Sequence, residues 1–156
     1  TETFPIIPGS ARILWFVVPI FAILIGVIVL LGSSIVAARA ARFEISPAGL
    51  RLRGDMYGRM IPAAALDPVG ARAVDLTAEK SLKPAMRTNG AGLPGFSSGW
   101  FRLNDGQKAL LYVTDPSRVA YVPTRDGYAV MVSVADPDAF VTTLRRVVTA
   151  SAARTE

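Results

Sequence analysis

The chain has 156 residues, carries a formal net charge of +5 and contains neither cysteine nor histidine. Without cysteine there are no disulfides and no thiol chemistry, and without histidine the commonest general base and metal ligand is missing. A positive excess this mild fits a surface beside anionic lipid at least as well as a nucleic-acid surface, which would need basic clusters interleaved with exposed aromatic side chains.

An uncharged stretch runs from Ile13 to Ala38, and most of its side chains are apolar. As a helix its 26 residues would extend ~39 Å, more than the ~30 Å hydrocarbon core of a bilayer. A cleaved signal peptide is the alternative, but its apolar region usually has only ~7–15 residues. We therefore expect a permanent transmembrane helix over these residues, preceded by an N-terminal tail at 1–12.

Basic residues flank the expected span unequally. Arg12 stands alone before it, whereas Arg39, Arg42, Arg51 and Arg53 follow it. We expect the span to lie in the cell (inner) membrane. By the positive-inside tendency, its C-terminal domain would then lie in the cytoplasm and its N-terminus outside. Arg39 and Arg42 are expected at the level of the lipid head groups.

Small residues interrupt the surface of the expected span at Gly26, Gly32 and Ser33. Such positions let a second helix approach closely, although they are common in any span. The two glycines are not spaced as in a G-x-x-x-G motif. A helix–helix contact and an ordinary span therefore both stay open as interpretations.

From Arg42 onward, apolar and polar residues alternate, and turn residues interrupt the pattern every five to ten positions. Alternation predicts half-buried strands, and Asn-Asp-Gly at 104–106 is a strong hairpin signal. The pattern favours about seven short antiparallel strands that form a barrel or sandwich. The expected strands lie within 43–45, 50–53, 56–61, 69–76, 100–103, 108–114, 119–122 and 128–134.

A helix is expected near the C-terminal end of the chain. Asp136 is a typical N-cap residue, and proline is favoured at the first helical position, which Pro137 would take. The apolar residues that follow share one helical face, which can be buried only against the open end of the barrel. Residues 150–156 are expected to fray. The apolar face consists of Phe140, Val141, Leu144, Val147 and Val148.

Antiparallel strands followed by one C-terminal helix are the element order of a pleckstrin-homology-like domain. The glycine-rich stretch from Arg87 to Gly95 and the following Gly99-Trp100-Phe101 resemble the bacterial PH domain family, as do Phe43-Glu44-Ile45-Ser46 and Asp136-Pro137. The resemblance covers residues 42–148, within an expected domain at 39–149. It implies a mainly-β fold and a non-enzymatic, membrane-associated role, with no catalytic residues.

The glycine-rich stretch matches the residue patterns of two functional motifs, but the sequence around it does not supply the structural context that either motif needs. Residues 90–95 match G-x-G-x-x-G, but a dinucleotide site needs a helix directly afterwards, and the following proline, glycines and serines cannot begin one. Residues 95–99 match G-x-S-x-G, but a nucleophilic serine needs a base, and the chain has no histidine. We therefore expect neither a cofactor nor a hydrolase site.

The segment 80–99 is expected to be a long loop between strands. No acidic residue occurs from 80 to 104, so the cations there have no local counter-charge. Loops of this length are usually functional or disordered. Either it packs on the body of the domain through Leu93, Phe96 and Trp100, or it contacts a membrane partner or lipid head groups. Its candidate contact residues are Asn89, Gly90, Gly92, Pro94, Gly95 and Trp100.

Two functions therefore compete, and an enzyme is disfavoured because the aspartates at 115, 126, 136 and 138 occupy turn or cap positions. In the first, the chain is an accessory subunit of a larger integral membrane complex. In the second, the domain binds anionic lipid head groups; Arg51 and Arg53 share one strand face, which is otherwise an ordinary solvated face. The proposed lipid contacts are Arg51, Arg53, Lys80, Lys83 and Arg87.

Overall fold

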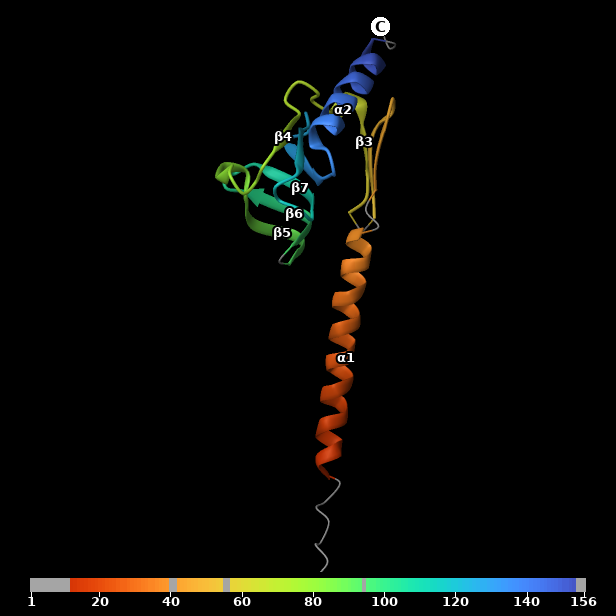
Figure 1. Cartoon of the computed structure of the whole chain (residues 1–156), viewed down its shortest axis with the longest axis vertical. Helices are drawn as coiled ribbons and strands as arrows, with labels where there is room; N and C mark the ends of the chain where they lie inside the picture. Colours follow the sequence, from red (N-terminus) through yellow and green to blue (C-terminus); the bar gives the residue numbers. More distant parts are fainter. Residues whose placement is uncertain (1–11, 40–41, 55–56, 94, 154–156) are drawn as a thin grey trace, which may run out of the picture. The chain divides into compact units, whose positions relative to one another are not determined.

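The computed structural model describes residues 12–39, 42–54, 57–93 and 95–153. The chain divides into two compact units, Thr1–Val36 and Ala37–Glu156. Of the expected tail at 1–12, residues 1–11 lie outside the described residues, and Arg12 is the first residue of the first helix. Figure 1 follows the chain from its first helix to its last.

The helix α1 (Arg12–Arg39) has 28 residues, contains Pro19 and lies in the first unit up to Val36. Side chains are described without interruption over 14–30, and all of them are exposed. Among the described residues, no helix is both long enough and apolar enough to cross a membrane. For the residues that the structure describes, the prediction of a transmembrane helix at 13–38 is therefore wrong.

The second unit begins with a three-stranded antiparallel sheet in the order β1-β2-β3. Its inner face is apolar, because Leu50, Leu52 and Ile61 are fully buried. The strands expected at 43–45 and 50–53 are confirmed, whereas the third strand is shorter than expected. The strands are β1 (Arg42–Ser46), β2 (Gly49–Arg53) and β3 (Met60–Pro62).

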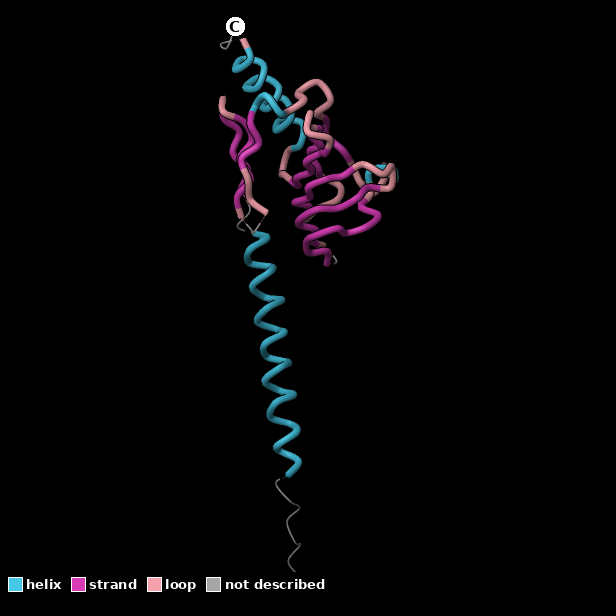
Figure 2. The backbone as a smooth tube through the Cα atoms, turned by 180° about the vertical axis from the view of Figure 1, so that it is seen from behind, coloured by secondary structure: helices cyan, strands magenta, loops and turns pink. Residues whose placement is uncertain are grey.

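A larger sheet has the order β4-β8-β9-β7-β6-β5, and Figures 1 and 2 show β5, β6 and β7 side by side. The mainly-β domain with a C-terminal helix is confirmed, but the all-antiparallel arrangement is wrong, because β7 and β9 pair in parallel. The strands are β4 (Arg72–Val74), β5 (Pro84–Leu93), β6 (Phe96–Leu103), β7 (Lys108–Val113), β8 (Val119–Pro123) and β9 (Tyr128–Ser133).

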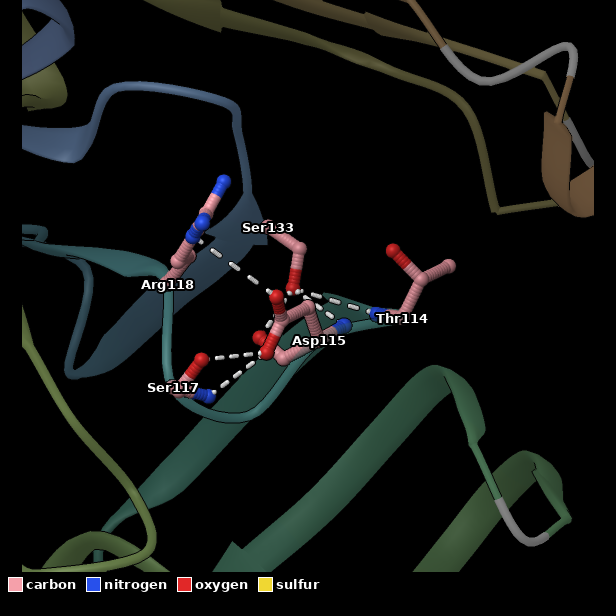
Figure 3. Close-up of polar contacts among 5 residues, drawn as sticks. All are labelled: Thr114, Asp115, Ser117, Arg118 and Ser133. Atoms are coloured by element: carbon pink, nitrogen blue, oxygen red, sulfur yellow. Dashed lines mark hydrogen bonds and ion pairs between the residues drawn. The ribbon is translucent and has the colours of Figure 1, made fainter.

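The parallel pair arises because β9 inserts between β7 and β8 rather than extending the meander at its edge. The loop at 114–118 must then cross the end of β9, where Ser133 holds it (Figure 3). The Ser133 hydroxyl accepts hydrogen bonds from the backbone N–H groups of Thr114 and Asp115, each at 3.1 Å, and donates one to the carbonyl of Asp115 at 2.8 Å. One hydroxyl thus satisfies three backbone groups of the crossing.

Strands β7, β8 and β9 are buried on both faces, so the sheet separates two apolar cores. Neighbouring residues of a strand point to opposite faces, and Leu110 belongs to one core while Leu111 belongs to the other. The first core is shared with the three-stranded sheet and the C-terminal helix. The second is closed by Leu76 and by Leu82, which lies in the short 3-10 turn η2 (Lys80–Leu82).

The C-terminal helix α2 (Pro137–Ala152) has the predicted start. The Asp136 carboxylate accepts a hydrogen bond from the backbone N–H of Ala139 at 2.9 Å, as an N-cap does. Three residues of the predicted apolar face are buried in the first core: Val141, Leu144 and Val148.

Candidate interaction surface

The glycine-rich segment forms the hairpin β5–β6 rather than the expected loop. Gly90 pairs with Gly99 in its register, and both have positive φ, at +154° and +109°. A Cβ on Gly90 would lie 2.2 Å from the carbonyl oxygen of Ser98, and one on Gly99 would lie 2.5 Å from that of Asn89. The two strands therefore approach too closely here for any side chain, which explains the glycines without a phosphate ligand.

Trp100 of β6 is half-buried and carries two cationic groups on its ring. The Arg59 Cζ lies 4.9 Å and the Lys108 Nζ 4.4 Å from the ring centroid. Tyr128 of β9 packs edge-on against the same ring, at 5.1 Å between centroids. We call Arg59, Trp100, Lys108 and Tyr128 the Trp100 cluster.

A hydrogen bond links the segment before β3 to the edge of the large sheet. The Tyr57 hydroxyl donates to the Asn89 Oδ1 at 3.0 Å, and Asn89 is the register partner of Trp100 on β5. Tyr57 and Arg59 are thus held beside the hairpin β5–β6. The Trp100 cluster and this bond together join the two sheets on the side of the first core.

Within the described residues, no carboxylate forms an ion pair with Arg59 or Lys108. The ion pairs found there lie elsewhere: Glu44 with Arg53, Glu79 with Arg72, and Asp115 with Arg118. The two cations of the Trp100 cluster are both exposed and keep their charge available at the surface. An arginine and a lysine stacked on one indole form a rigid aromatic base with two positive groups, an arrangement suited to an acidic ligand.

The model of the family described as bacterial PH domain matches residues 41–148, well over half of the chain. The chain belongs to the bacterial PH domain family. No curated protein and no solved structure matches it significantly. PH-like domains are generally non-catalytic interaction modules, so the surfaces of this bacterial PH domain matter as places where a partner can bind.

The outer face of the first sheet of the PH domain holds three of the predicted basic residues. Arg51 and Arg53 are both exposed on β2, as the alternation predicts, and Arg42 is the register partner of Arg53. Glu44 lies among them, with its Oε1 3.5 Å from the Arg53 Nε. The face is therefore basic but contains its own counter-charge.

The five residues predicted to contact lipid do not form one patch. Arg51 and Arg53 lie on the outer face of the three-stranded sheet, whose inner face covers the first core. Lys80 belongs to η2, which closes the second core on the opposite face of the large sheet. Lys83 is half-buried beside a surface hollow of about 310 Å³ near the end of β7, and Arg87 is exposed on β5.

The remaining predicted contact residues are scattered. Gly92 lies on β5, and Gly95 forms the hairpin turn with φ of +76°. Gly26 and Gly32 of α1 face open space, because a Cβ at either position would have no atom within 4 Å. Three further positions lie outside the description: Pro94 entirely, and Ser33 and Arg39 in their side chains.

Both letter-matching motifs of the PH domain lack their functional context. The G-x-G-x-x-G residues lie in β5 and its turn, and the G-x-S-x-G residues lead into β6, so neither opens a helix. Ser97 is half-buried in β6 without a base supplied by its neighbours in the register, Gly92 and Val113. In the described part of the chain, no three carboxylates gather as a metal site would require.

The carboxylates with altered pKa values serve turns and surface pairs. The hydroxyl and then the backbone N–H of Ser117 lower the pKa of Asp115 by hydrogen bonding to its carboxylate. Thr77 lowers the pKa of Asp75 in the same way, and the hydrogen bond from Arg72 lowers that of Glu79. Each shift favours the ionised form and accounts for the group without catalysis.

The sequence singles out Trp100 as a candidate contact residue, which stays a prediction, but not the residues around its ring. Lys108 was within reach of prediction: because Trp100 pairs with Leu110, Lys108 lies diagonal to Trp100 on the same face. Arg59 and Tyr57 come from the segment before β3, and no local spacing relates them to β6. Only the packing of one sheet on the other brings Arg59 to the indole and Tyr57 to Asn89.

Proposed function

We propose that this bacterial PH domain protein is a non-enzymatic accessory subunit that binds a larger integral membrane protein complex. The PH domain would bind an acidic surface of the partner through the Trp100 cluster. The exposed apolar surface of α1 would bind an apolar surface of the same partner.

The Trp100 cluster carries this proposal. Aromatic rings and arginine are the residue types that dominate protein–protein contact energies, particularly where they are held rigidly. Here two cations are preorganised on a half-buried indole, so little side-chain entropy would be lost when an acidic partner binds. The absence of a paired carboxylate among the described residues leaves this charge for the partner.

The apolar surface of α1 supports the same proposal. Its described side chains point in all directions around the helix and are all exposed, including Trp15 at 84% and Phe16 at 71%. Exposed apolar surface of this extent marks an interaction site rather than a free surface. Two contacts on one chain, one apolar and one charged, would reinforce each other through effective concentration.

The test is extraction of the tagged full-length chain from its source membranes in mild detergent, followed by native electrophoresis and mass spectrometry. We expect comigration with a defined complex at a fixed stoichiometry. For the double variant Arg59→Glu/Lys108→Glu, the amount of chain that comigrates with the complex should fall by at least about tenfold. This corresponds to about 1.4 kcal/mol of binding free energy.

Arg146→Glu is the matched control, because Arg146 is an exposed arginine on α2, away from the Trp100 cluster. It should comigrate as the unaltered chain does. A chain that always migrates alone, or a double variant that binds as well as the control, would contradict the proposal.

Anionic lipid binding is the second candidate, favoured by the exposed Arg42, Arg51 and Arg53 on the first sheet. Flotation of the full chain with phosphatidylserine vesicles, compared with phosphatidylcholine vesicles, tests it. Binding through this face should fall in Arg51→Glu/Arg53→Glu and persist in Arg59→Glu/Lys108→Glu. If binding to the vesicles instead fell in Arg59→Glu/Lys108→Glu and persisted in Arg51→Glu/Arg53→Glu, the lipid-binding charges would be those of the Trp100 cluster.

A further inference from the structure

We infer that the outer edge of β5 binds an extended acidic segment of the partner by adding it as a further strand to the large sheet. This inference rests on the proposed function and names how the PH domain would hold the partner. It concerns the backbone of β5, which the Trp100 cluster flanks.

Strand β5 is the longest strand of the PH domain and ends the order of the large sheet. It pairs only with β6, and no other described backbone group bonds to residues 84–92. Alternate N–H and C=O groups of an edge strand point away from its neighbour, so this edge offers a row of unpaired donors and acceptors. Strand addition is the binding mode that uses such a row.

The side chains of β5 leave the edge accessible. Residues 85–89 are all exposed, and Met86 exposes 57% of its surface. The two register irregularities lie at 85 and 88, whereas residues 89–93 pair with β6 without interruption. A regular, uncharged stretch of this kind can accept a strand that the irregular part would reject.

The opposite edge of the sheet does not offer the same surface. Strand β4 has only three residues, and its Arg72 already bonds both carboxylate oxygens of Glu79. A strand added there would find few backbone groups and a neutralised charge. The two edges therefore differ in length and in available charge, and β5 is the one suited to a partner.

The charge around β5 selects an acidic strand. No acid occurs from 80 to 104, and Arg87 lies on β5 itself. Trp100 lies on β6, the strand next to β5, where it pairs with Asn89 of β5. The cationic groups of Arg59 and Lys108 lie over its ring. A second copy of this chain would bring like charges together at the paired edges, so self-pairing is disfavoured and an acidic segment is favoured.

Fluorescence anisotropy of the full chain in mild detergent tests this inference with three labelled octapeptides. The first alternates glutamate and valine, the second replaces every glutamate by lysine, and the third is the first with every backbone amide N-methylated. We expect the glutamate peptide to bind at least about tenfold more tightly than either of the others. Equal binding of the N-methylated peptide would overturn strand addition, because it keeps the charge and loses the backbone donors.

Two further measurements locate the bound strand. Amide hydrogen exchange should slow over residues 89–93, the regular part of β5, when the glutamate peptide is present. Arg87→Glu should weaken binding by about fivefold or more, whereas Arg146→Glu should leave it unchanged. Failure of the glutamate peptide to bind, protection elsewhere, or sedimentation of the chain as a dimer paired at β5 would each overturn the inference. Comigration of the chain with a larger complex could still be observed in each of these cases. Failure of this inference is therefore distinguishable from failure of the proposed function.

Discussion

The inner strands β7 and β9 and the outer hairpin β5–β6 belong to the same sheet but are stabilised differently. In β7, five consecutive residues from Ala109 to Val113 are buried, and in β9 four consecutive residues are buried, so both faces of each strand lie in apolar cores. In β5, side chains 85–89 are exposed, and the strand is held to β6 by its backbone ladder and by a close contact between two glycines.

This difference indicates which part of the domain is available for binding. Apolar burial leaves residues 109–113 of β7 and 129–132 of β9 no side-chain surface to offer a partner, and only the first residue of each strand, Lys108 and Tyr128, reaches the Trp100 cluster. The hairpin contributes a long edge and the Trp100 ring; its outer strand β5 has no buried side chain among those described, whereas β6 buries Phe101 and Leu103 in the second core. Neighbouring strands of one sheet thus serve stability and binding. Substitutions in the buried strands should lower the free energy of unfolding more than substitutions in β5 do.

Leu110→Ala should have the largest effect on stability. Leu110 is fully buried at the centre of the first core, so its truncation leaves a cavity and should lower the free energy of unfolding by about 2–5 kcal/mol. Met86→Ala on β5 is the matched control and should cost less than about 0.5 kcal/mol, because the side chain is exposed. Urea unfolding of both variants measures the comparison, and similar losses would refute it.

Gly90→Ala should destabilise the hairpin by an intermediate amount. The new Cβ would lie 2.2 Å from the Ser98 carbonyl oxygen at a φ of +154°, so the strands must separate, at a cost of about 1–3 kcal/mol. Gly95→Ala, at the turn with no atom within 4 Å, shares the unfavourable φ but not the clash and should cost less. Thermal unfolding in which Gly95→Ala proves the more destabilising of the two would show that the close approach is not what requires glycine.

The sequence predicts the local elements of this fold better than their arrangement. Alternation and turn residues locate most strands, and the Asp136-Pro137 pair locates the start of α2, because these signals depend on neighbouring residues. The parallel pairing of β7 with β9 depends on where a hairpin inserts, which no local pattern specifies. The apolar run at 109–113 signals a strand buried on both faces, which a barrel with one interior does not explain.

The glycine-rich segment is where prediction from the sequence departs furthest from the structure. Its glycine, proline and serine residues between 90 and 99 resemble a loop, yet Gly90 and Gly99 are strand residues in a close backbone contact. Trp100 could be predicted as a contact residue from its place beside this segment. Its cationic partner Arg59 could not, because the contact depends on how the two sheets pack.

Ser133→Ala should loosen the crossing over the end of β9. The substitution removes the acceptor for two backbone N–H groups, those of Thr114 and Asp115, and should cost about 1 kcal/mol because water can partly replace it. Ser133→Thr keeps the hydroxyl and is the matched control. Chemical denaturation should give the alanine variant the lower stability, and equal stabilities would remove this role for the hydroxyl.

Acidification should have the smallest effect, and at this crossing it should act through the carboxylate of Asp115. Hydrogen bonds from Ser117 hold the pKa of Asp115 below its ordinary value, so the folded loop favours the carboxylate. The stabilisation is complete above the unfolded pKa of about 3.9 and is lost as the pH falls through the lower folded pKa. Amide exchange at Ser117, corrected for the intrinsic pH dependence, should therefore accelerate below about pH 3.9, and Asp115→Asn should abolish that acceleration. Protection of Ser117 that stays constant well below that pH would show that the carboxylate does not hold the loop.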